Sequence, residues 1–342
     1  MTPETAPDGA PWEALPPPLS DLHEAAARLR GVALETPLLE SERLNARLGG
    51  RVLVKAEGLQ HTGSFKLRGA WNYLAQLPRA RAAGGLVALS SGNHGQAVAW
   101  AGRRLGLGPV VVLMPRDTPR AKVERTRFWG AGVEFYDRQT VDRAALLGHW
   151  TSQRGYHLVP AYDDRRVIAG AGTLALEAMA QAAGQGAVPD LLVVACSGGG
   201  LSAGCALALQ GGKTRLLAVE PPGHDDLLRS LEAGRRLTNA GNVPSICDAL
   251  LAITPGALPF GIHQQHGTRA AVVTDDQARA AVFTLFAEFG LVVEPGGALP
   301  LGALLADPAL VRGRTVMVIA SGRHLDGSLL AEIVTRSAPP PA

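Results

Sequence analysis

The sequence predicts an α/β protein with two open, mainly parallel, twisted sheets flanked by helices, in which a small domain is inserted into a larger one. Three observations predict this class. Short runs rich in Val, Ile and Leu recur along the chain, each closed by Gly, Pro or polar residues. Alanine-rich stretches separate several of these runs, and a chain of 342 residues is long enough for two sheets.

The β-branched runs are typical of strands buried on both faces. They occupy residues 52–55, 86–91, 109–115, 133–137, 191–197, 216–220 and 315–322. A short helix is predicted over residues 21–30, before the first run, and alanine-rich stretches between the runs predict helices over residues 96–105 and 201–210. We expect residues 1–77 and 164–342 to form a discontinuous large domain and residues 78–163 to form the small one.

Composition excludes several classes of protein. The 46% hydrophobic content and formal charge of +3 argue against disorder and against nucleic-acid binding. Three cysteines without CxxC spacing favour a reducing compartment over a disulfide framework or a thiolate zinc site. The Pro-rich start lacks the pattern of a secretory signal, and no apolar run reaches membrane-spanning length, so we expect a cytoplasmic protein without a membrane partner.

A glycine-rich loop follows one predicted strand. Residues 191–210 run from that strand through Ser197, Gly198, Gly199 and Gly200 into a helix, an arrangement that directs backbone N–H groups at a phosphate. A tight turn without a ligand is the alternative. The loop also satisfies the G-x-G-x-x-A pattern, with Glu220 about twenty residues on, so a dinucleotide-dependent oxidoreductase stays open at this point.

Two further loops place polar side chains beyond strand ends, where open α/β sheets bind ligands. In residues 86–100, Ser91, Asn93 and His94 lie at the tip of a turn that opens a helix. The structural alternative is that Ser91 or Asn93 only caps that helix. Ser321 follows the last predicted strand in the same way.

Lys66 is one of only four lysines in the chain. Thr62 or Ser64 is predicted to cap a helix that has Lys66 in its first turn. A cation is disfavoured there, since a helix N-terminus favours negative charge. This position therefore indicates a neutral amine or an imine, as Schiff-base chemistry requires, rather than a solvated surface lysine.

Taken together, these segments resemble the fold type II (β-family) pyridoxal-phosphate enzymes, and more narrowly the serine/threonine dehydratase and serine racemase branch. The resemblance covers roughly residues 33–330. It is carried by GSFKLRGA (63–70), SSGNHGQA (90–97), SGGGL (197–201), VVEPGGA (292–298) and SG (321–322).

The resemblance implies a role for each matching residue. Lys66 would hold pyridoxal 5'-phosphate through an imine bond and then take the substrate's Cα proton. The phosphate would be bound by Ser197, Gly198, Gly199, Gly200 and Leu201. The ring would be contacted by Phe65, Asn93, Ala249 and Ser321. The substrate carboxylate would be bound by Ser91, Gly92, Asn93 and His94.

The resemblance also implies a reaction. We expect α,β-elimination of L-threonine or L-serine to a 2-oxo acid and ammonia in a homodimeric enzyme. Serine racemisation is an alternative within the family, in which Ser91 acts as acid or base on the cofactor face opposite Lys66. A 3-hydroxyaspartate dehydratase, with Arg143 pairing a second carboxylate, is another. In racemase-like members, acids at the positions of Glu220 and Asp226 and the backbone carbonyl at the position of His224 bind Mg²⁺, Ca²⁺ or Mn²⁺.

Some residues depart from the family pattern. Arg323 and His324 stand where the branch has Gly and Asn, and Ala249 stands where many members have Gly. These changes add bulk beside the expected ring, so they bear on substrate size.

Overall fold

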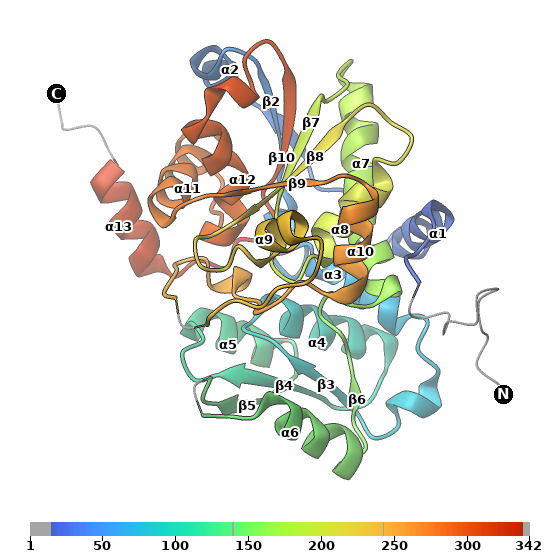
Figure 1. Ribbon diagram of the computed structural model, residues 1–342. Helices are drawn as coiled ribbons and strands as arrows, with labels where there is room; N and C mark the ends of the chain where they lie inside the picture. Colours follow the sequence, from blue (N-terminus) through green and yellow to red (C-terminus); the bar gives the residue numbers. More distant parts are fainter. Residues whose placement is uncertain (1–14, 139, 242, 338–342) are drawn as a thin grey trace.

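The computed structural model describes residues 15–138, 140–241 and 243–337. Figure 1 shows two layered halves, each a sheet with helices on both faces, which confirms the predicted fold class. The predicted domain limits stay a prediction. The Pro-rich N-terminal segment, in which no secretory signal pattern was found, lies mostly outside the described residues.

The larger sheet has six strands in the order β1-β2-β10-β7-β8-β9. All neighbouring pairs are parallel except β1 and β2. The strands are β1 (Leu38–Glu40), β2 (Arg51–Lys55), β7 (Leu191–Ala195), β8 (Arg215–Glu220), β9 (Arg269–Val272) and β10 (Thr315–Ile319).

Successive residues of a strand point to opposite faces of this sheet, as the two-residue period of a strand requires. Val52 and Val54 pack with one group of helices, whereas Leu53 between them packs with the other. The first group is α2 (Glu42–Leu48), α11 (Asp275–Phe289), α12 (Pro295–Ala306) and α13 (Gly327–Ser337). The second is α1 (Leu19–Leu29), α7 (Arg165–Gly184), α8 (Gly200–Ala208) and α10 (Ala257–Gln265).

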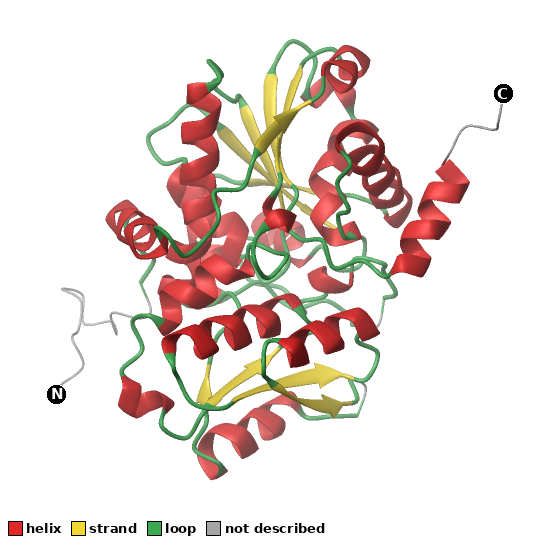
Figure 2. Ribbon diagram, turned by 180° about the vertical axis from the view of Figure 1, so that it is seen from behind, coloured by secondary structure: helices red, strands yellow, loops and turns green. Residues whose placement is uncertain are grey.

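The smaller sheet is wholly parallel, in the order β5-β4-β3-β6. Its strands are β3 (Leu86–Leu89), β4 (Val110–Pro115), β5 (Gly132–Tyr136) and β6 (His157–Leu158). On the side of the larger half lie α3 (Lys66–Leu74), α4 (Asn93–Leu105) and α5 (Arg120–Phe128), while α6 (Arg143–Gly148) covers the outer face (Figure 2).

Helix α7 is 20 residues long and apolar enough, by length and composition alone, to cross a membrane. Our expectation that no segment would reach that length is therefore wrong. However, 61% of its apolar window is buried in the protein, and the helix packs against α8, α3 and α1. The apolarity of α7 is thus explained by its central place in the larger half.

The seven predicted strands and three predicted helices are present, with ends shifted by a few residues. Strands β1, β6 and β9 were not predicted. They have two to four residues each, too few to show a period.

Candidate active site

A cavity of about 240 Å³ lies where the carboxyl ends of the strands in both sheets converge. It is lined by every residue predicted to act in catalysis or to bind cofactor or substrate, except Gly92. Gly92 instead lies behind the lining, where an added Cβ would meet the Lys122 methylenes at 2.6–2.9 Å. The fold therefore brings the three separate loops and Lys66 to one place.

Lys66 is the first residue of α3, and its buried amine donates to the carbonyl oxygen of Ala161 at 2.8 Å. Burial lowers the pKa of Lys66 to about 8. Desolvation disfavours the ammonium form, so about a tenth of the amine is neutral at pH 7, far more than for an ordinary lysine. This is the state that imine formation requires.

The predicted capping of this helix is wrong. The N-cap is Phe65, which makes no side-chain cap, and the hydroxyls of Thr62 and Ser64 are buried without a hydrogen-bond partner. Tertiary contacts hold the helix start instead: Phe65 N–H donates to the Ser321 carbonyl at 3.1 Å, and Ser64 forms a bridge with Gly322. These bonds join the lysine directly to the loop that carries Ser321.

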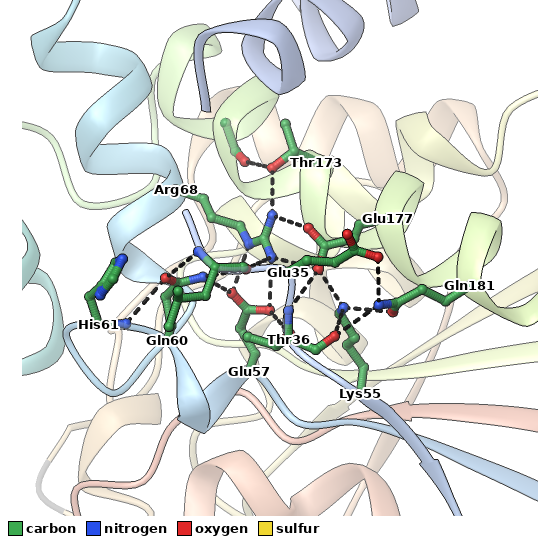
Figure 3. Close-up of polar contacts among 12 residues, drawn as sticks. Glu35, Thr36, Lys55, Glu57, Gln60, His61, Arg68, Thr173, Glu177 and Gln181 are labelled. Atoms are coloured by element: carbon green, nitrogen blue, oxygen red, sulfur yellow. Dashed lines mark hydrogen bonds and ion pairs between the residues drawn. The ribbon is translucent and has the colours of Figure 1, made fainter. Parts of the chain in front are cut away.

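A buried ionic network anchors the rest of α3 (Figure 3). Arg68 donates to Glu57 at 2.7 Å and pairs with Glu177 of α7 at 3.0 Å, while Lys55 of β2 lies 2.5 Å from Glu177. Burial disfavours the Arg68 cation, but the two carboxylates outweigh it and raise its pKa. The two cations and the two carboxylates of this network therefore balance in charge. Through Arg68, the network holds α3 in place two residues after Lys66.

The glycine loop leads from β7 into α8, whose first residue is Gly200. Gly199 has a φ of 93°, which favours glycine, and an added Cβ would lie 2.6 Å from Pro259. A Cβ on Gly198 would lie 2.5 Å from the ring of Tyr162. The bare backbone and the start of a helix form a cradle that fits a phosphate group.

Ser90, which was not among the predicted site residues, holds the second loop in place by hydrogen bonds. Its Oγ accepts hydrogen bonds from the N–H groups of Gly92 and Gly95, both at 3.0 Å. Ser90 thus performs the capping role considered for Ser91 and Asn93, so that alternative is wrong. The side chains of Ser91 and Asn93 remain in the cavity lining.

Asn93 Nδ2 donates to Glu294 Oε1 at 2.5 Å, and its Oδ1 is buried without a partner. Glu294 also lies 3.1 Å from Lys122 Nζ, which bonds both carboxylate oxygens of Asp248 at 2.7–2.9 Å. Lys122 is 1% exposed, and the two carboxylates outweigh its burial and raise its pKa. A buried cation from α5 therefore orders two acids of the larger half behind Asn93.

His94 is buried, and its Nε2–H donates to the Val159 carbonyl at 3.0 Å. Burial and the nearby Lys66 charge lower the pKa of this imidazole to about 3. His94 is consequently neutral at physiological pH, and its side chain ties the start of α4 to the Val159 carbonyl. The unpredicted lining residues are Tyr136, Arg138, Tyr162, Asp248 and Glu294, among others. Of these, Glu294 lies in the VVEPGGA motif (292–298) that carried the family resemblance.

The predicted metal ligands lie beyond β8. Glu220 accepts from the N–H groups of Leu227 and Leu228 at 3.0–3.1 Å, and His224 Nε2–H donates to the Val243 carbonyl. Asp226 Oδ2 is buried without a partner, and burial raises the pKa of Asp226 to about 6.

Among the described residues, no group of three His, Cys, Asp or Glu side chains is placed to hold a metal. The resemblance implies the backbone carbonyl of His224, and not its side chain, as a ligand. Two buried carboxylates, one with a free oxygen, fit a divalent cation chemically, and the metal stays a prediction.

The comparisons with known proteins agree with this geometry. The model of the family described as pyridoxal-phosphate dependent enzyme matches residues 29–322. An L-threo-3-hydroxyaspartate ammonia-lyase of Pseudomonas is 37% identical over 308 residues, covering 90% of this chain and 95% of that protein. The biosynthetic L-threonine dehydratase of Mycobacterium leprae is 39% identical over 94% of this chain and 76% of that protein. Maize serine racemase superposes with a TM-score of 0.85 at 30% identity, covering 93% and 97% of the two chains.

Proposed function

Because the chain belongs to the pyridoxal-phosphate-dependent enzyme family, within its ammonia-lyase branch, we propose that it eliminates water from L-threonine or L-serine. The enamine released isomerises to an imine, and water then hydrolyses that imine. The net products are ammonia and 2-oxobutanoate from threonine, or pyruvate from serine. The family match sets aside the dinucleotide interpretation of the Gly198 loop.

The single observation that supports the proposal best is the place of the Lys66 amine. It is buried, its pKa is lowered to about 8, and it lies in one cavity with the glycine cradle and the Ser91–His94 turn. The bound cofactor supplies a ring that withdraws electrons from the substrate's Cα. Lys66 can then move the Cα proton, which is the first requirement of elimination.

The other cavity residues orient the reactants. Ser90 Oγ occupies the N–H groups of Gly92 and Gly95. The N–H groups of Asn93 and His94 at the start of α4 have no intrahelical carbonyl to bond, so they suit the substrate carboxylate. Glu294 fixes the Asn93 amide by accepting from Nδ2, which turns the remaining Nδ2–H and the free Oδ1 toward other partners. Ser321, 7% exposed at the end of β10, presents a neutral hydroxyl to the ring side.

A second candidate substrate is L-threo-3-hydroxyaspartate, which the Pseudomonas relative is named for. Arg138 and Arg143 both line the cavity. They also line an adjoining cavity of about 920 Å³ between residues 116–144 and 224–253. An arginine in this position can pair a second carboxylate with two hydrogen bonds.

The test compares kcat/KM for L-threonine, L-serine, D-serine and L-threo-3-hydroxyaspartate, with and without a chelator. Under the main proposal, L-threonine or L-serine is preferred, and Arg143→Gln changes their kcat/KM by less than about threefold. Preference for hydroxyaspartate, with a loss of a hundredfold or more in Arg143→Gln, would establish the second candidate. Inversion of serine that is lost in Ser91→Ala, while elimination persists, would establish the racemase.

Three further expectations accompany the proposal. We infer a homodimer from family resemblance and a cytoplasmic location from the three cysteines, which are all free and buried. Loss of activity on chelation, restored by Mg²⁺, Ca²⁺ or Mn²⁺, would support the cation at Glu220 and Asp226.

A further inference from the structure

Behind the glycine loop, a buried histidine and two hydroxyl side chains form a chain of hydrogen bonds. Nε2 of His263, in α10, lies 2.9 Å from Ser202 Oγ of α8, and its Nδ1 lies 3.0 Å from Thr268 Oγ1. Ser202 Oγ in turn lies 3.1 Å from the Gly199 carbonyl oxygen. We propose that His263 is a positioning residue of the phosphate cradle, which acts through Ser202 on the Gly199 carbonyl. This deepens the proposed function, since it rests on the glycine loop as the phosphate site.

The three side chains of this hydrogen-bond chain are shut off from solvent. His263 and Ser202 are 0% exposed, and Thr268 is 8% exposed. Burial lowers the pKa of His263 to about 3, so the ring is neutral and has one N–H donor and one bare nitrogen. A polar group without a partner costs free energy in such surroundings. The bond directions are therefore those that satisfy each of these groups.

One tautomer of His263 satisfies the whole chain. The Thr268 hydroxyl donates to Nδ1, and the ring Nε2–H donates to Ser202 Oγ. The Ser202 hydroxyl is then free to donate to the Gly199 carbonyl. The opposite tautomer would use the Ser202 proton on Nε2 and leave the Thr268 proton without an acceptor among the described residues. Cys196 Sγ lies 3.4 Å from Ser202 Oγ, but sulfur is a weaker acceptor than a carbonyl oxygen.

The Gly199 carbonyl determines where the next N–H group points. In a planar trans peptide, the C=O and the following N–H point in opposite directions. This carbonyl accepts from Ser202 and also from the Ala203 N–H at 2.8 Å, so it is held on the side of α8. The Gly200 N–H is consequently directed away from α8, and Gly200 lines the cavity that contains Lys66. Holding the carbonyl therefore orients one donor for the phosphate before the cofactor binds.

Helix α10 supports the glycine loop in two ways. It packs against α8 (Figure 1), and Pro259 and His263 lie one turn apart on the same face of it. A Cβ added to Gly199 would lie 2.6 Å from Pro259 and 3.8 Å from His263 Nε2. Pro259 thus supports the loop by packing and His263 by hydrogen bonding. Substitution of His263 alone separates the two effects.

The test titrates the full-length apoenzyme with pyridoxal phosphate and follows protein fluorescence. His263→Leu fills the space with an apolar side chain but removes the donor, and Ser202→Ala removes the last link. Each should weaken cofactor binding about tenfold, as expected for the loss of one hydrogen bond to a charged group. His263→Gln, whose amide N–H can take the place of Nε2–H, should keep the affinity within about threefold of the unmodified enzyme.

A double variant distinguishes a hydrogen-bond chain from a general loss of packing. Ser202→Ala and His263→Leu break the same chain, so their effects should not multiply, and the double variant should bind the cofactor like the weaker single variant. Thr284→Val is the matched control. Its buried hydroxyl bonds the Ala280 carbonyl within α11, on the opposite face of the larger sheet, and its loss should change the affinity less than about twofold.

Phosphorus NMR of the holoenzyme gives a readout that does not follow global stability. The phosphate resonance of the bound cofactor should move in the same direction in His263→Leu and in Ser202→Ala, because the same N–H group loses its orientation in both. It should stay in place in His263→Gln and in Thr284→Val.

Two results would overturn the proposal. One is a cofactor affinity within about twofold of the unmodified enzyme in both His263→Leu and Ser202→Ala, and the other is effects that multiply in the double variant. If the melting temperature shows that His263→Leu is unfolded, Ser202→Ala decides by the same twofold limit. Neither result bears on the turnover of threonine or serine, and Gly199→Ala tests the loop itself. Failure of this proposal is therefore distinguishable from failure of the proposed function.

Discussion

At the scale of single residues, burial of the Lys66 amine sets the proton balance of the site. Only the neutral amine attacks the aldehyde of pyridoxal phosphate, and the pKa of Lys66 is lowered to about 8. The rate of cofactor capture by the apoenzyme should therefore rise with pH to a plateau, with its midpoint near 8. Stopped-flow absorbance between pH 6.5 and 9.5 measures this rate.

The Lys66→Ala variant is the control, since the exposed Lys213 is still present to report adventitious capture. It should show no fast phase and no elimination activity. A rate that still rises without a plateau at pH 9.5, as expected for the usual lysine pKa of 10.5, would contradict the idea that the cavity desolvates this amine.

Lys122 gives a second prediction at this scale. Its replacement by Met leaves the buried Glu294 and the partly buried Asp248 without their shared cation, which should cost about 3–5 kcal/mol of stability. Burial already raises the pKa of Asp248 and Lys122 opposes that rise, so this pKa should rise further in the variant. The penalty of the unpaired Asp248 carboxylate is fully present when it is ionised and shrinks as it becomes protonated, so the loss should be larger at pH 8 than at pH 5.

Urea unfolding at the two pH values tests this, with Lys213→Met as the matched control because that lysine is exposed and has no ion pair in the described structure. If the stability lost in Lys122→Met is equal at both pH values, the Lys122 cation does not affect the ionisation of these carboxyls.

The sequence allowed Lys66, the glycine loop and Ser321 to be predicted because each is marked by local signals. Glu294 lies in a motif of the family resemblance, but neither Glu294 nor Lys122 nor Asp248 carries a local signal of its burial. Glu294 immediately precedes α12, Lys122 lies in α5, Asp248 lies in a short turn at 248–250, and only the packing of the two halves brings them together. Charged residues of this kind are read from sequence as surface residues, since their burial depends on partners far away in the chain.

At the scale of elements, the glycine loop should not tolerate a side chain. Gly199→Ala forces a Cβ against Pro259 at a φ of 93°, which should cost about 1–3 kcal/mol of strain. We expect pyridoxal phosphate to bind at least tenfold more weakly, as measured by fluorescence titration.

Gly186→Ala is the matched control for this loop. Gly186 has a φ of 66°, and an added Cβ there would meet nothing within 4 Å. It should share some backbone destabilisation but keep full cofactor affinity. Equal loss of affinity in both variants would mean that the loop acts only through global stability.

A helix or strand could be predicted where its hydrophobic pattern was long. The residues at which it begins and ends could not be predicted as well. The run at residues 109–115 identifies β4 almost to the residue. By contrast, α4 begins at Asn93, three residues before its predicted start, because Ser90 caps the turn from outside the helix. A cap that reaches over intervening residues is set by loop geometry, which composition does not reveal.

At the scale of the whole molecule, α3 links the halves, since it packs on α4 below and α7 above (Figure 1). Glu177→Gln removes one carboxylate from the Lys55 and Arg68 network and leaves an excess buried cation. This should destabilise the enzyme by about 3–5 kcal/mol. Burial raises the pKa of Glu177, but Arg68 outweighs burial and holds this pKa below its unfolded value. The stability that the Glu177 carboxylate contributes is therefore present above the unfolded pKa and is lost as the pH falls through the folded pKa.

Chemical unfolding at pH 7 and at pH 4 checks this, with Glu24→Gln as control. Glu24 pairs with Arg28 on an exposed helix surface, where such a pair contributes less than about 1 kcal/mol. A Glu177→Gln loss no larger than the control would exclude the network as a support of α3.

The strand order of the larger sheet has a consequence for synthesis of the chain. Strand β2 joins that sheet only through β10, which is made more than 250 residues later. The smaller sheet, in contrast, is built from one continuous stretch, residues 86–158. As the chain leaves the ribosome, the smaller sheet can assemble early, while the β1–β2 pair must wait with the second edge of β2 unpaired. Premature termination anywhere before Thr315 therefore leaves β1 and β2 without their neighbour, and such fragments present an open edge for aggregation.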